Sequence, residues 1–155
     1  MINTQRLTHI YVTFLLPALI GFVAVHWALQ SGYIELLSRQ DRAMVAVPLF
    51  VLTAISALAA PILYRAFFAH WHRHRLTMPL ETLVRFECNL IGITMVTPYL
   101  ALVAYLLQVP RFHFSGILLM AMYAVYYYFP SQRRISADRK IFRAAPAGVP
   151  GADHN

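Results

Sequence analysis

Charged residues are scarce in this chain of 155 residues. Lys, Arg, Asp and Glu together make up 12% of it, whereas an ordinary soluble domain carries about 25%. Hydrophobic residues make up 59%, and the mean hydropathy is +0.57. The apolar residues fall in blocks of near-spanning length instead of recurring on one amphipathic face, so the sequence predicts an integral membrane protein.

Other absences exclude whole classes of chemistry. The chain has one cysteine, Cys88, so an internal disulfide, a CxxC redox pair and a cysteine zinc cluster cannot form. The first apolar block has no carboxylate of the kind that small multidrug exporters use, and its polar side chains beyond the first turn are Thr13 and His26. Clustered aspartates, a Ser/His/Asp set and a glycine-rich phosphate loop are also missing, so no enzymatic activity is predicted.

Four apolar segments have the length that a membrane-spanning helix needs. They cover residues 10–29, 44–64, 86–107 and 112–129, and about twenty residues at 1.5 Å each cross the roughly 30 Å hydrocarbon layer. Only QVPR separates the third segment from the fourth, which leaves room for a tight turn alone. The sequence therefore predicts an all-α protein with four transmembrane helices, of which helices three and four form a tight hairpin.

The basic residues predict the orientation of these helices. Thirteen Lys and Arg residues give the chain a net charge of +7, and they gather at the ends of the apolar segments, without the patterning of an RNA-binding module. Ten lie in the amino-terminal segment, the second connection and the tail, and three lie on the other side: Arg39, Arg42 and Arg111. Because basic flanking residues stay in the cytoplasm, both termini should be cytoplasmic in a multi-pass protein of the cell inner (plasma) membrane.

One domain followed by a tail is expected from the composition. Residues 1–143 should form the four-helix transmembrane domain, and residues 144–155 have the Pro, Gly and Ala content of a disordered tail. The expected partners are the lipid bilayer and other membrane protein subunits, and nucleic acid is not among them.

The stretch AHWHRHRL, at residues 69–76, gathers three histidines and two arginines. On a helix only His70 and His74 would share a face, and a metal site needs more ligands than these two. The nearest acid is Glu81, and the arginines repel a cation. We interpret the stretch as the cytoplasmic connection that fixes topology, in which His70 and His74 are weak metal candidates and Trp71 lies at the headgroups.

His26 and His113 form a second candidate pair. One lies near the end of the first segment and the other near the start of the fourth, so both could lie at one depth near the outer face. Membrane cytochromes hold haem between histidines of different helices. The pair therefore leaves open a haem b or quinone binding electron-transfer subunit, against the simpler role of hydrogen bonding at the membrane surface.

Glu87 is the sole acid within a predicted span. Ionisable groups inside a membrane are costly and mark functional sites. Glu87 lies about one turn from the boundary, so a salt-bridged or snorkelling carboxylate is one reading, and a proton or cation site in a small transporter or channel is the other.

The second segment carries TAISALAA at residues 53–60, in which small residues recur four apart and allow close helix contact. Such helices are suited to packing, yet they hold almost no catalytic groups. The function indicated first is that of a non-enzymatic accessory or anchor subunit of a membrane complex, with no cofactor of its own.

Overall fold

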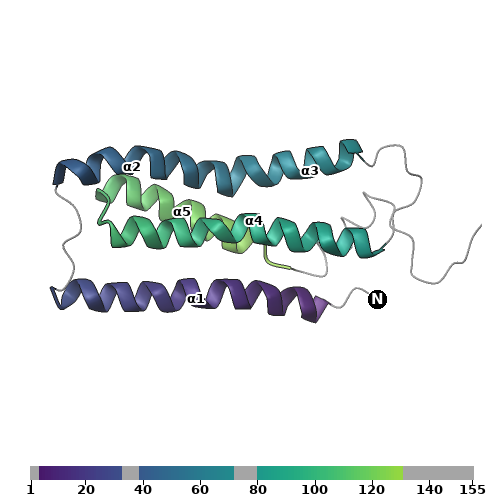
Figure 1. Cartoon of the computed structure of the whole chain (residues 1–155), viewed down its shortest axis with the longest axis horizontal. Coiled ribbons are helices and arrows are strands. Elements are labelled where there is room, and N and C mark those ends of the chain that lie inside the picture. Colours follow the sequence, from purple (N-terminus) through teal and green to yellow (C-terminus); the bar gives the residue numbers. More distant parts are fainter. Residues whose placement is uncertain (1–3, 33–38, 72–79, 131–155) are drawn as a thin grey trace, which may run out of the picture.

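The structure, a computed structural model, describes residues 4–32, 39–71 and 80–130. Within these ranges it is helical and contains no strand. The elements are α1 (Thr4–Gln30), α2 (Arg39–Ala54), η1 (Ile55–Ala59), α3 (Ala60–Trp71), α4 (Leu80–Leu106) and α5 (Arg111–Tyr127). Because α2, η1 and α3 follow one another without a break, they form one continuous rod, the second in chain order, which runs alongside α4 in Figure 1.

Three helical stretches are long and apolar enough to cross a membrane. The crossing stretches are Leu7–Gln30, Gln40–Trp71 and Val84–Leu106, which confirms a membrane protein with transmembrane helices. Lipid offers the backbone no hydrogen-bond partner, so apolar blocks of this length fold as helices, whose N–H and C=O groups satisfy one another. α5 has 17 residues and is about 25 Å long. The crossing of α5 and the side on which the termini lie remain predictions.

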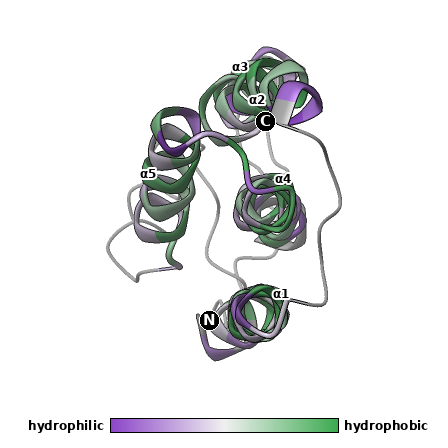
Figure 2. Cartoon of the chain, turned by 90° about the vertical axis from the view of Figure 1, so that its left-hand side faces the viewer, coloured by the Kyte–Doolittle hydropathy of each residue, from purple (hydrophilic) through white to green (hydrophobic). Residues whose placement is uncertain are grey.

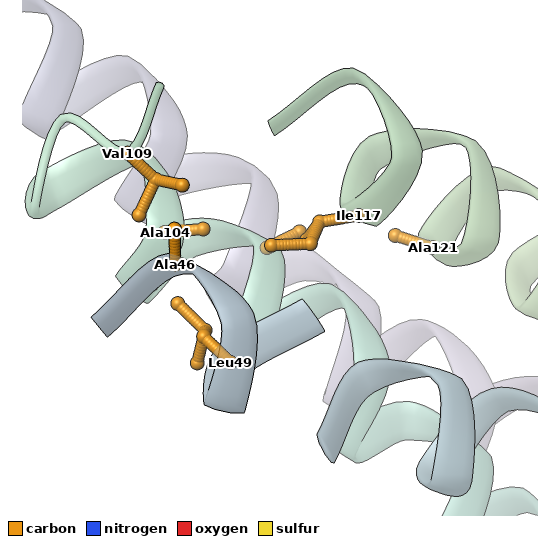
Figure 3. Packing of buried hydrophobic residues seen from close by; sticks show 7 residues of the cluster. Ala46, Leu49, Ala104, Val109, Ile117 and Ala121 are labelled. Carbon is orange, nitrogen blue, oxygen red and sulfur yellow. The ribbon is translucent and has the colours of Figure 1, made fainter. Parts of the chain in front are cut away.

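α4 lies at the centre of the bundle. It contacts α1, α5 and the α2–α3 rod, and in the end-on view α1 and the rod lie on opposite sides of it, with α5 on a third side (Figure 2). The core between α2, α4 and α5 is built from small and medium apolar residues. Figure 3 labels six of them: Ala46, Leu49, Ala104, Val109, Ile117 and Ala121. The alanines let the helices approach closely, which is the usual basis of helix packing in lipid.

The turn between α4 and α5 is the tight hairpin expected at QVPR. The Val109 N–H donates to the Ala104 carbonyl over 3.1 Å, and the Gln108 N–H donates to the Tyr105 carbonyl over 3.0 Å. These two bonds make up a Schellman motif, whose left-handed residue is Gln108, with φ of 51°. Pro110 follows and begins α5 as its N-cap, so the turn is complete within four residues.

The second rod contains one widened turn, η1. Pro61 has no backbone N–H, so the carbonyl four residues before it loses its usual donor. The chain responds with five-residue spacing, in which the Ala60 N–H donates to the Ile55 carbonyl. Such π-helical turns disturb the regular order of side chains on a helix face. Within this turn Ser56 and Ala57 are buried.

Candidate functional sites

His26 lies in the last part of α1 and is hydrogen bonded through both ring nitrogens. Nδ1 is 2.7 Å from the Tyr105 hydroxyl, and Nε2 is 3.1 Å from the Gln30 amide nitrogen. Because the amide nitrogen of Gln30 donates, Nε2 accepts and Nδ1 carries the proton that it donates to Tyr105. Tyr105 itself packs between Phe22 and Phe114, at ring distances of 5.8 and 5.5 Å. The arrangement fastens the end of α1 to α4, and coordination of a metal by His26 would break one of its bonds.

His113 lies in the first turn of α5 and faces a different helix. Its ring is edge-on to Phe50 of α2, at 6.3 Å, and to its neighbour Phe112, at 5.6 Å. Among the described residues, its buried Nδ1 has no hydrogen-bond partner. Phe50 can approach this turn because residue 116 is a glycine: a Cβ there would lie 2.6 Å from Phe50 Cε2.

The two histidines thus lie on helix turns at the same end of the bundle, but they are directed to different helices. His26 is bonded to α4, and His113 packs on α2. Since α1 and the α2–α3 rod lie on opposite sides of α4 (Figure 2), a shared ligand would have to reach around the aromatic cluster at Tyr105. The electron-transfer role of the pair remains a prediction.

Glu87 lies inside the bundle on α4, with 3% of its surface exposed. Its neighbour Phe86 stacks on Tyr64 at 5.3 Å and lies 4.2 Å from the Phe68 ring, both on α3. The Asn89 amide donates to the Tyr64 hydroxyl over 3.1 Å. A carboxyl group buried inside the bundle is costly in lipid, so Glu87 is a functional candidate. The ion pathway predicted for Glu87 remains a prediction.

A seam of buried hydroxyl groups joins the second rod to α4. The Ser56 and Thr97 hydroxyl groups are 3.1 Å apart across the two helices. Thr53 donates to the Leu49 carbonyl over 2.7 Å, and Thr94 donates to the Leu90 carbonyl over 3.0 Å. Each hydroxyl is therefore satisfied within the packed interface, as expected where TAISALAA forms a close helix contact.

The stretch AHWHRHRL is divided by the end of α3. His70 and Trp71 are helical and exposed, whereas His72, His74 and the rest of the connection lie outside the described residues, as does the tail at 144–155. Within residues 4–32, 39–71 and 80–130, no three His, Cys, Asp or Glu side chains are grouped so as to hold a metal ion.

Sequence reasoning missed the tyrosines that fasten α1 to its neighbours. The Tyr11 hydroxyl donates to the Val125 carbonyl of α5, and the Tyr99 hydroxyl of α4 donates to the Phe14 carbonyl over 2.7 Å. Their bonds to backbone carbonyls could not be read from the sequence, because they depend on which helices become neighbours.

A hollow lies between α1 and α5, with Pro98 of α4 among its lining residues. Its volume is about 1190 Å³, and apolar side chains of α1 and α5 form most of its surface. No candidate residue named from the sequence lines it.

The chain belongs to the class of helical membrane proteins. Its helices are long and apolar, and small residues and scattered hydrogen bonds hold them together. No known protein family matches the chain, and neither does any curated protein or solved structure.

Proposed function

We propose that the chain is a non-enzymatic accessory or anchor subunit of a complex in the cell inner (plasma) membrane. In this proposal it crosses the membrane four times, with both termini in the cytoplasm, and partner subunits supply the chemistry. The ten-to-three imbalance of basic residues supports the orientation.

The positions of the interhelical hydrogen bonds are the observation that supports this proposal. The interhelical bonds of Tyr11, Tyr99, Ser56 and His26 each link a different pair of elements or a different level of the bundle. They lie along the helices instead of converging on one substrate-sized site. Polar groups arranged in this way hold helices together, and this is the role expected of a structural subunit.

The second rod offers a surface on which a partner helix could pack. Apolar residues recur on it every three or four positions, and all are exposed: Met44, Val47, Val51, Ile55, Leu58 and Ile62. This row covers eighteen residue steps, about 27 Å, which is close to the roughly 30 Å hydrocarbon thickness. Spacing of this kind forms the seam of packed helix pairs.

The test is recovery of the complex from native membranes. We expect the tagged chain, extracted in mild detergent, to migrate on a native gel with a partner in fixed stoichiometry. Val51→Trp should reduce that recovery, and Val23→Trp, the same change on an exposed position of α1, should leave it intact. A chain that migrates alone, or equal loss from both variants, would contradict the proposal.

A second candidate is a haem b or quinone binding subunit that uses His113, with His26 as the other ligand. The buried Nδ1 of His113, which has no partner among the described residues, favours this candidate. The two bonds of His26 count against it, because one would have to open. A visible spectrum of the purified protein decides: a Soret band that shifts with dithionite and is lost in His113→Ala would establish haem.

A small transporter or channel is the third candidate, and the burial of Glu87 favours it. In proteoliposomes, such a protein would show a cation or proton flux that Glu87→Gln abolishes. An equal flux in the wild type and in Glu87→Gln would show that Glu87 is not part of the ion pathway.

A further inference from the structure

The hollow between α1 and α5 has the shape of a groove along both helices. Its α1 lining runs from Tyr11 to Phe22, and its α5 lining runs from Leu118 and continues past the helix end to Phe129. Both helices pack on α4 but lie apart from each other in the end-on view (Figure 2). At one end Tyr11 closes the gap, because its hydroxyl bonds to Val125 and its ring lies 5.4 Å from Phe129.

The length of the groove matches one leaflet of a bilayer. The α1 lining covers eleven residue steps, about 16 Å along a helix, and the helical part of the α5 lining, from Leu118 to Tyr127, covers nine, about 14 Å. Half of the hydrocarbon layer is about 15 Å thick, whereas a transmembrane partner helix would lie against the full 30 Å or so. The groove is therefore half as long as a partner helix requires and as long as a lipid acyl chain in one leaflet.

The volume and the lining point to the same kind of occupant. At about 1190 Å³, the groove exceeds the roughly 300–1,000 Å³ of small-molecule sites. Its walls are aliphatic and aromatic, and Pro98 and Ala121 leave space between the larger side chains. Such a surface offers hydrocarbon chains contact area without demanding any hydrogen bond.

The closed end of the groove lies where a lipid headgroup would be. Tyr126 and Tyr127 line it there and are exposed, and tyrosine side chains prefer the headgroup level. In the sequence, Arg6 belongs to the first turn of α1, and Arg133 and Arg134 follow the last residue of α5 by six and seven positions. Basic residues near a membrane surface attract anionic headgroups.

We propose that the groove between α1 and α5 holds the acyl chains of an anionic phospholipid from the leaflet on the side of the chain termini. The lipid fills the space that α1 and α5 leave over α4 and so completes the packing of α1. This proposal concerns the isolated chain and is independent of the accessory role, because its test needs no partner subunit.

A pair of neighbouring leucines on α5 provides a matched test. Leu118 lines the groove, whereas Leu119 is 69% exposed and does not line it. The full chain, purified in detergent, is incubated with dioleoyl phosphatidylglycerol, and retained lipid is counted by native mass spectrometry. We expect retention by the wild type and by Leu119→Trp, and a loss of roughly tenfold in Leu118→Trp, since the indole ring takes up space needed by the chains.

Two further measurements identify the occupant. Dioleoyl phosphatidylcholine has the same chains without net negative charge, and we expect it to be retained less. A photoreactive benzoylphenylalanine in place of Tyr126, an exposed aromatic residue that lines the groove, should give an adduct with the mass of a phospholipid when it is activated in native membranes. An adduct with a polypeptide or a quinone would overturn the proposal, as would equal retention by both tryptophan variants or no retention by the wild type. Equal retention of the two lipids would refute the anionic preference.

Discussion

Ala57→Leu tests the packing of the second rod most directly. Ala57 is 0% exposed and lies in a cluster with Phe86, Leu90, Ala124 and Tyr128, so its methyl group meets side chains of α4 and α5. Leucine adds three carbon atoms where no space is left. Overpacking of this kind typically costs about 1 to 3 kcal/mol.

The expected loss can be measured as a shift of the melting temperature. For a chain of this size, 1 kcal/mol corresponds to roughly 2 to 4 °C, so Ala57→Leu should lower the transition in detergent by about 2 to 12 °C. Ala66→Leu is the control, because it makes the same change on an exposed face of α3. Ala60, which is only partly buried, should give an intermediate loss. If Ala57→Leu costs no more than Ala66→Leu, the packing argument for TAISALAA is wrong.

Three other predictions concern separate parts of the chain. Gly116→Ala should destabilise the protein by about 1 to 3 kcal/mol, because the added Cβ would lie 2.6 Å from a ring carbon of Phe50. Gly92→Ala is the control: nothing lies within 4 Å of its added Cβ, so it should be neutral or stabilising in the same melting assay. Gln108→Gly should stabilise the chain by about 1 kcal/mol, since φ of 51° strains every residue but glycine. An unchanged or lower melting temperature would show that the Gln108 side chain contributes more than the strain costs. A reporter fused after residue 145 should be active in its cytoplasmic form and silent in its periplasmic form, and the reverse result would invert the topology.

The coarse fold could be predicted because the bilayer restricts which backbone structures are possible. Apolar blocks of spanning length must be helical in lipid, and QVPR leaves space only for a tight turn. The ends of the helices were less predictable: the second rod was expected at 44–64 but extends from Arg39 to Trp71. An apolar block marks the part of a helix that lies in hydrocarbon, and polar residues at either side continue the same backbone hydrogen bonding.

The candidate sites show where sequence reasoning ends. Depth along a helix can be read from residue numbers, so His26 and His113 could be placed near the same end of the bundle. The direction in which each ring points depends on the rotation of its helix, which is set by contacts such as those of Tyr105 and Phe50. The widened turn at η1 was missed for a similar reason. Pro61 indicates a disturbed helix, but its form depends on the neighbouring helix.

The position of α1 against α4 affects how the protein is made. The Tyr99 and Tyr105 bonds that hold α1 come from residues 85 and 79 positions later in the chain. At about 5 to 20 residues per second, a ribosome needs roughly 4 to 17 seconds to supply them. During that time α1 must remain in the bilayer without its main partner, which its apolar surface permits. A charged substitution in α1 should therefore impair membrane insertion, even at a position that other helices later cover. The reason is that α1 enters the bilayer before those helices have been synthesised.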